Sequence, residues 1–143
     1  MYKDILLPVD LQDSISWQKS KADAVELARV FAATLHVMTV VPTYHMSIVG
    51  SFFPQGYEQK MLEAARVKLH EFVREHIAGE NMRVQHIVGH GTVYEEVLRV
   101  AREIDADLII LGASRPLAGQ FLPGPNAARV MSHAQCSVLV ARD

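Results

Sequence analysis

The 143-residue sequence contains one cysteine, Cys136, which excludes an internal disulfide and a metal site built from paired cysteines. It also lacks any apolar run near the roughly 18 residues that a transmembrane helix needs. The apolar stretch Ile5–Val9 is too short for the hydrophobic part of a secretory signal. We therefore expect a cytoplasmic protein.

An excess of charge of one sign is missing as well. Lysine and arginine together number 14, aspartate and glutamate 16, and the formal net charge is −2. This balance excludes a nucleic-acid-binding protein that relies on a broadly basic surface, and it excludes a polybasic membrane anchor. A site for a small anion stays open, because such a site needs only a few local groups.

The length is that of one domain, and we expect residues 1–143 to share a single core. Half of the residues are hydrophobic, which excludes a disordered tail. No internal repeat, low-complexity tract or linker interrupts the chain.

Five short apolar runs predict five strands, at Ile5–Val9, Leu35–Val41, Val84–Val88, Leu108–Leu111 and Val138–Ala141. Several of these runs are nearly continuous in Val, Ile and Leu, which is typical of parallel strands buried on both faces.

Segments with helical periodicity separate the strands. The first expected helix has an apolar face that ends at Phe31, and the second has one from Leu62 to Val73, before Gly79. A shorter helix, the fourth along the chain, is expected over Asn126–Ala134. Thr92 and Glu95 have the spacing of a capping box at the start of the third helix. The alternation predicts an α/β fold with a five-stranded, parallel, doubly wound sheet in a Rossmann-like three-layer sandwich.

Ligands of open parallel sheets bind beyond the carboxyl ends of the strands. The first strand ends in Pro8, Val9 and Asp10, whose carboxylate could accept hydrogen bonds from ribose hydroxyls. Capping of the following turn is an equally good explanation of Asp10.

The fourth strand ends in Gly112, and the Gly- and Pro-containing loop from Ala113 to Pro125 leads directly into the fourth helix. Backbone N–H groups of such a loop and the helix dipole can hold a phosphate, with Ser114 and Arg115 adding a hydroxyl and a charge. Gly and Pro also mark ordinary turns. The loop lacks the Gly-Lys-Ser/Thr of a Walker A loop.

The segment 42–56 is long for a connection in one compact domain, and it is rich in apolar side chains. Packing over a sheet edge or a dimer partner is the interpretation we favour, and a lid over a ligand is the alternative.

Three stretches carry a family resemblance: 2–10 (YKDILLPVD), 106–112 (ADLIILG) and 133–140 (HAQCSVLV). Together with Gly91-Thr92-Val93, they resemble the universal stress protein family in the right order along essentially the whole chain. This resemblance implies a regulatory homodimer of the stress response that pairs through the last strand and binds ATP or AMP, with Mg²⁺ as an accompanying ion. The dimer edge would consist of Val138, Leu139 and Val140.

The resemblance also implies a nucleotide site. Its residues would be Pro8, Val9, Asp10, Val40, Val41, Gly112, Ala113, Ser114, Arg115, Gly124, Pro125, Asn126 and Ala127. Asp10 would contact the adenosine, Val40 and Val41 would lie against adenine, and the loop after Gly112 would wrap the phosphates.

The loop departs from the family pattern Gly-x2-Gly-x9-Gly-Ser/Thr. Arg115 replaces the second glycine, and Gly124 comes one residue early. The shortened loop resembles a subgroup that ends Gly-Ser-Asn-Ala, but here Pro125 stands in place of the serine and lacks both the hydroxyl and the N–H. A nucleotide-free dimeric interaction protein with a lapsed phosphate loop is therefore the alternative. No residue set predicts catalysis or a metal site.

Overall fold

The computed structural model describes residues 1–42, 56–77, 81–113 and 125–142. Most of the segment 42–56, Gly79, Ser114, Arg115 and Gly124 lie outside the described residues.

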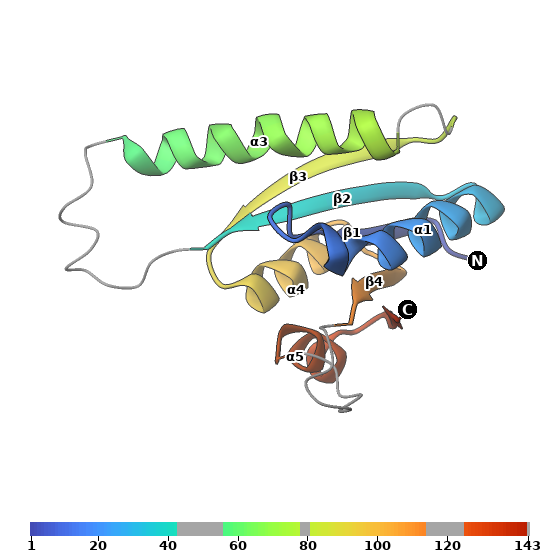
Figure 1. The fold of residues 1–143 in the computed structure, drawn as a ribbon. Helices are drawn as coiled ribbons and strands as arrows, with labels where there is room; N and C mark the ends of the chain where they lie inside the picture. The colour runs from blue at the N-terminus through green and yellow to red at the C-terminus, as the bar shows by residue number, and fades with distance from the viewer. Residues whose placement is uncertain (43–55, 78–80, 114–124, 143) are drawn as a thin grey trace.

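Five parallel strands form one sheet in the order β3-β2-β1-β4-β5, which confirms the predicted architecture (Figure 1). The strands are β1 (Asp4–Pro8), β2 (Thr34–Val41), β3 (Val84–His90), β4 (Leu108–Gly112) and β5 (Ser137–Ala141). β1 lies at the centre of the sheet, with β2 and then β3 on one side and β4 and then β5 on the other. The strand order therefore reverses between β1 and β4.

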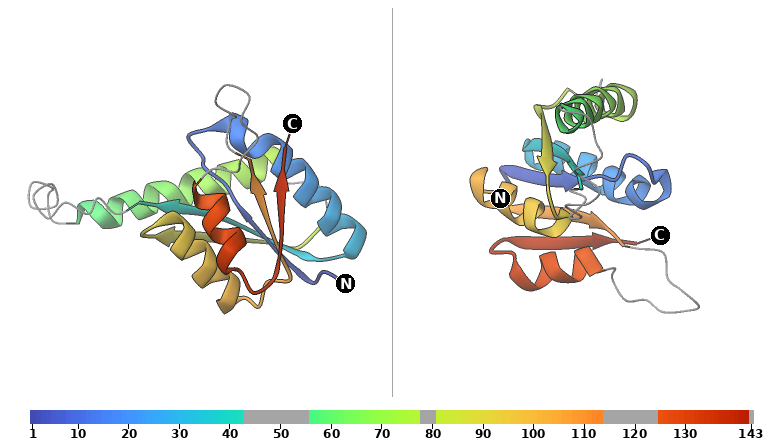
Figure 2. Two further views of the ribbon diagram at one scale, coloured as in Figure 1. Left: turned by 90° about the horizontal axis from the view of Figure 1, so that it is seen from below. Right: turned by 90° about the vertical axis from the view of Figure 1, so that its left-hand side faces the viewer.

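Helices cover both faces of this sheet, as the two views in Figure 2 show. They are α1 (Ser14–Phe31), α3 (Tyr57–His76), α4 (Val93–Glu103) and α5 (Pro125–His133). Residues of α1 and α3 share one hydrophobic cluster with the sheet, and residues of α4 and α5 share the other. None of the described helices is long and apolar enough to cross a membrane.

The strand β1 shows why its sequence is a continuous apolar run. Ile5 and Leu7 belong to the cluster under α1 and α3, while Leu6 belongs to the cluster under α4 and α5. All three side chains are fully buried. Alternate residues of a strand face opposite sides, so a strand covered on both sides needs apolar residues throughout.

Some predicted boundaries were wrong by one or two residues. The structure places the first strand at Asp4–Pro8, with Val9 still donating its N–H to the carbonyl of Met38 (2.8 Å). The third strand continues past Val88 to His90, because Val40 and Val41 pair with Gly89 and His90.

The capping box expected at α4 is absent. Thr92 is the N-cap residue, but its side chain makes no capping hydrogen bond. Glu96 rather than Glu95 bonds upstream, accepting from the N–H of His90 (3.0 Å). Gly91 enters this turn at φ +139°, in a region that favours glycine.

Candidate functional site

A cavity of about 460 Å³ lies at the carboxyl ends of the strands, where the strand order reverses. Residues following β1 and at the ends of β2 and β4 form its floor, the start of α5 closes one side, and α3 closes the other. This is the place that parallel-sheet topology predicts for a ligand. The lining includes eight of the residues predicted from the sequence: Pro8, Val9, Asp10, Val40, Val41, Gly112, Asn126 and Ala127.

Other predicted residues are placed differently. Ala113 is not part of the cavity lining, and its N–H donates to the carbonyl of Ala141 (2.9 Å). Pro125 is the first residue of α5. Because Ser114, Arg115 and Gly124 lie outside the described residues, their part in the site stays a prediction.

Asp10 has the contacts of a turn residue. Its Oδ1 accepts the N–H of Gln12 (3.0 Å), and its carbonyl accepts the N–H of Asp13 (3.1 Å). Its other carboxylate oxygen has no hydrogen-bond partner among the described residues, and the side chain is exposed at the cavity. Turn capping and ligand binding are thus compatible, because each can use a different oxygen.

The α5 end of the cavity suits a negatively charged group. The first N–H groups of a helix have no partner within the helix, and the helix dipole places partial positive charge there. Asn126 and Ala127 from this first turn line the cavity, and the turn contains no acidic residue. Pro125 contributes no N–H to this end.

The wall formed by α3 was not predicted from the sequence. It consists of Met61, Ala64, Ala65 and Lys68, whose spacing puts them on one face of the helix. The helical periodicity from Leu62 to Val73 predicts an apolar face but not a cavity wall, since small apolar residues such as Ala65 serve equally well for packing. A lysine within an apolar face is the one signal that could have marked this wall.

A contact between two side chains joins the beginning of α3 to the sheet. Glu58 in the first turn of α3 pairs with His90 at the end of β3, with 2.8 Å between Oε1 and Nε2. Further along α3, Phe72 packs edge-on against Trp17, with ring centroids 4.7 Å apart. Trp17, Thr39 and Met38 also line the cavity, so it has aromatic, polar and apolar surfaces.

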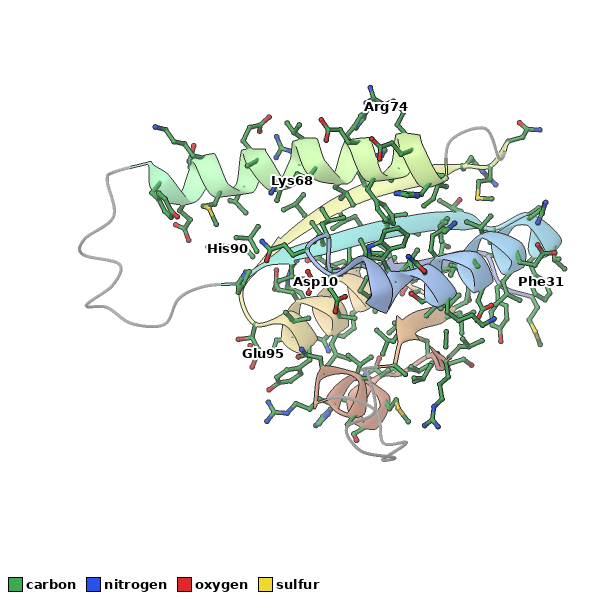
Figure 3. The ribbon with its side chains drawn as sticks, viewed as in Figure 1. Asp10, Phe31, Lys68, Arg74, His90 and Glu95 are labelled. Atoms are coloured by element: carbon green, nitrogen blue, oxygen red, sulfur yellow. The ribbon has the colours of Figure 1, made fainter. Side chains whose placement is uncertain are left out.

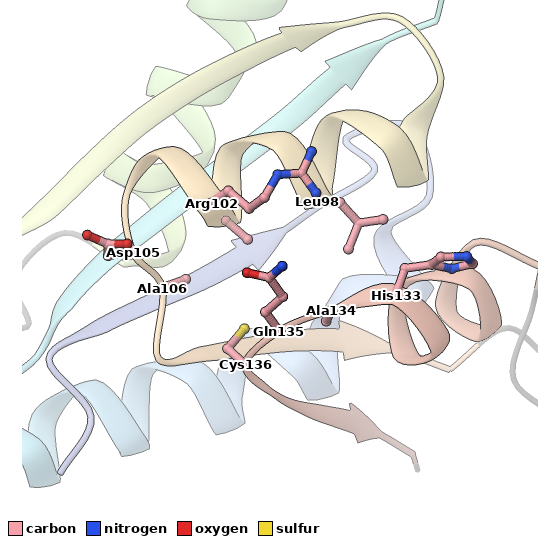
Figure 4. Close-up of a pocket in the computed structure, with 9 residues that line it drawn as sticks. Leu98, Arg102, Asp105, Ala106, His133, Ala134, Gln135 and Cys136 are labelled. Atoms are coloured by element: carbon pink, nitrogen blue, oxygen red, sulfur yellow. The ribbon is translucent and has the colours of Figure 1, made fainter.

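A second, smaller cavity of about 200 Å³ lies between the ends of α4 and α5 (Figure 4). Its lining includes Arg102, Asp105, His133 and Cys136. Burial is the main cause that raises the pKa of the Cys136 thiol, and the charge of Asp107 raises it further. The thiol is therefore protonated near neutral pH and a poor nucleophile. No group of three or more potential metal ligands occurs among the described residues.

The model of the universal stress protein family matches residues 1–142. The chain belongs to this family. It is 30% identical to universal stress protein G of Escherichia coli O157:H7 over 144 residues, covering 99% of this chain and all of that protein.

Solved structures of universal stress proteins share the fold. One from Lactobacillus plantarum superposes with a TM-score of 0.76 at 24% identity, covering 99% of this chain and 98% of that one. A family member from Arabidopsis thaliana, solved with AMP bound, has a TM-score of 0.69 at 16% identity, covering 98% of this chain and 91% of that one.

The last strand, β5, lies at one edge of the sheet and pairs with β4. Val138, Leu139 and Val140 are each partly exposed. This universal stress protein thus has the edge position that the sequence predicted for a dimer contact. Pairing of two chains there stays a prediction.

Proposed function

We propose that this universal stress protein binds ATP or AMP in the cavity at the carboxyl ends of the strands and acts as a regulatory homodimer of the stress response. The observation that carries the proposal is the convergence of Asp10, the end of β2, Gly112 and the start of α5 on one cavity. A bound AMP in the Arabidopsis thaliana relative supports an adenine nucleotide as the ligand.

Each part of the cavity has chemistry that suits one part of a nucleotide. The free oxygen of Asp10 can accept hydrogen bonds from ribose hydroxyls. Val40 and Val41 provide an apolar surface for a base, and the N–H groups at the start of α5, which have no partner within the helix, suit the phosphates. Ser114, Arg115 and Gly124 would complete the phosphate side as in the subgroup with a shortened loop, and Mg²⁺ would accompany ATP.

A regulatory role fits the chemistry better than catalysis. The described lining residues include one carboxylate, Asp10, and no cysteine, histidine or serine. Thr39 and Lys68 are the other possible nucleophiles, and a nucleophile of either kind needs an activating base beside it, for which the described lining offers no histidine. We propose a cytoplasmic protein that changes its partners with nucleotide occupancy rather than an enzyme.

The second candidate is a nucleotide-free dimeric interaction protein, favoured by Pro125 at the start of α5. Proline removes one N–H, and the family's serine hydroxyl is also missing, so two hydrogen bonds to phosphate are lost. Each such bond contributes about 1.5–3 kcal/mol. In this alternative the lapsed site leaves only the dimer and a protein partner.

Nucleotide analysis of the purified protein separates the two candidates. Under the first, adenine nucleotide co-purifies, or ligand at 100 times its Kd adds about 2.7 kcal/mol to the free energy of unfolding. A melting temperature unmoved by millimolar Mg-ATP or AMP, together with no co-purified nucleotide, supports the second candidate instead.

The dimer is tested separately. An exposed apolar edge strand offers unpaired backbone groups to another chain, and a two-fold axis would place one β5 beside the other. We expect light scattering to give the mass of two chains at micromolar concentration. A monomer mass would contradict the pairing and leave the nucleotide proposal standing.

A further inference from the structure

The charges around the main cavity are few. Among the described residues that line it, Asp10 is the only acidic side chain and Lys68 the only basic one. They come from different elements: Asp10 follows β1, and Lys68 lies on α3. Without Lys68, the described lining would carry a net charge of −1, which opposes an anionic ligand.

The helix directs Lys68 toward the cavity. Side chains in a helix lean toward its N-terminus and cover the preceding turn. For Lys68 that turn contains Ala64 and Ala65, which both line the cavity and are too short to fill it. Figure 3 shows Lys68 on the side of α3 that faces the strands.

The ammonium group of Lys68 has no ion pair or hydrogen bond with any described residue. Some basic side chains on the helices are paired: Lys19 with Asp23, Arg66 with Glu63, and Arg99 with Glu96 and Glu103. Lys60 on the same helix is, like Lys68, without an ion pair among the described residues, but only Lys68 lines the cavity. A lysine that lines a cavity and is not used in a structural ion pair is available to a ligand.

We infer that Lys68 selects phosphorylated nucleosides over uncharged nucleosides in this cavity. The inference rests on the proposed nucleotide site and adds a residue that determines its specificity. Asp10 serves the ribose but repels phosphate. Lys68, on the α3 side of the cavity, offsets that repulsion through its charge and not through direct contact with the phosphates at the start of α5. Asp10 and Lys68 are both exposed at the cavity, so solvent screens their charges in part, and the effect on an anion within the screening length of about 8–10 Å is moderate.

The test compares AMP with adenosine, because these ligands differ only in the phosphate. Isothermal titration calorimetry on the full chain measures both affinities for the wild type, Lys68→Met and Lys68→Arg. The methionine variant keeps most of the stem and loses the charge, whereas the arginine variant keeps the charge. Lys60→Met is the matched control, since Lys60 lies on the same helix about 12 Å away along its axis and is not part of the lining.

We expect Lys68→Met to weaken AMP binding about fivefold, ATP binding more, and adenosine binding less than about twofold. Lys68→Arg and Lys60→Met should stay within about twofold of the wild type for all three ligands. Added NaCl should weaken AMP binding to the wild type more than to Lys68→Met, because the charge pair is screened.

Two results would overturn the inference. Unchanged AMP affinity in Lys68→Met would show that the ammonium does not act on the ligand, and equal losses for AMP and adenosine would show that Lys68 contacts the nucleoside instead. Both results leave nucleotide binding itself intact. Absence of AMP and ATP binding in the wild type would instead overturn the proposed function, and this inference with it.

Discussion

The carboxylate of Glu96 accepts a hydrogen bond from the backbone N–H of His90, with 3.0 Å between Oε1 and N. Glu96 lies in the first turn of α4 and His90 ends β3, so this bond closes the turn between them. The same carboxylate holds the guanidinium of Arg99 through two hydrogen bonds of 2.8 and 2.9 Å. The bonds to Arg99 are the largest cause that lowers the pKa of Glu96, and the bond from His90 adds to it.

We predict that Glu96→Ala lowers the free energy of unfolding by about 1–3 kcal/mol, because the partly buried N–H of His90 loses its acceptor. Urea denaturation measures this. Glu96→Gln keeps an acceptor oxygen and should lose less. Glu95→Ala is the control, since Glu95 is exposed and accepts only from the hydroxyl of Tyr94. Equal losses at positions 95 and 96 would contradict the assignment.

The same carboxylate predicts a pH dependence. A carboxyl group with a lowered pKa stabilises the folded state at pH values above its ordinary pKa, here 4.5, and this contribution is lost as the pH falls through the lowered value. The stability difference between wild type and Glu96→Gln should therefore be larger at pH 7 than at pH 3. A difference that grows on acidification would contradict this sign.

The sheet was predictable because parallel strands covered on both sides need continuous apolar runs, as at Ile5–Leu7. The end of β3, at Gly89 and His90, was not, because glycine is depleted in strands. Gly89 is explained by a tertiary contact: a Cβ on it would lie 3.2 Å from Oε1 of Glu96. Glycine at position 89 lets β3 pass close to α4. The strand propensities of single residues cannot predict such a contact between two elements.

Some residues of the candidate site could likewise be predicted from the sequence, and others could not. Asp10 and Gly112 were predictable, because the topology places the ends of their strands at one edge of the sheet, and Val41 followed from the family resemblance. Met61 and Lys68 were not, because α3 is distant in sequence and its helical face reads as core. The position of α3 over the strand ends depends on tertiary packing such as that of Phe72 against Trp17, and these contacts exist only in the folded chain.

The stacked rings of His70 and His86 give a further pH prediction. Their centroids lie 4.7 Å apart and link α3 to the edge strand β3. Burial is the main cause that lowers the pKa of His86, and the charge on His70 lowers it further. In His70→Gln, the pKa of His86 measured by NMR titration should rise toward 6.5, because the charge on His70 no longer lowers it.

The lowered pKa of His86 also predicts how the free energy of unfolding changes with pH. A histidine with a lowered pKa binds its proton less readily when folded, so the folded state loses stability as the pH falls through 6.5. Between pH 7 and pH 5 the wild type should lose more stability than His70→Gln. His133→Gln on α5 is the control and should resemble the wild type. An unchanged pKa of His86 in His70→Gln would contradict the coupling.

Gly112 ends β4 at the cavity, so a branched side chain there would take up space that the ligand needs. We predict that Gly112→Val weakens AMP binding about tenfold or more, while the circular dichroism spectrum stays that of the wild type. Gln85→Val adds the same side chain at an exposed position of β3 outside the cavity lining, and it should bind AMP normally. AMP binding retained in Gly112→Val would place the ligand elsewhere.

Trp17, the only tryptophan of the chain, should report on the ligand directly. Its side chain is 8% exposed, packs edge-on against Phe72 and lines the cavity, so a ligand there replaces water near the indole. We expect tryptophan emission to shift saturably with AMP, with the same Kd as calorimetry gives. In Gly112→Val the shift should need about tenfold or more AMP to reach its midpoint, and Trp17→Phe should bind AMP with no tryptophan signal. Calorimetric binding without any change in emission would mean that AMP occupies a site away from Trp17, and the proposed cavity would then be wrong.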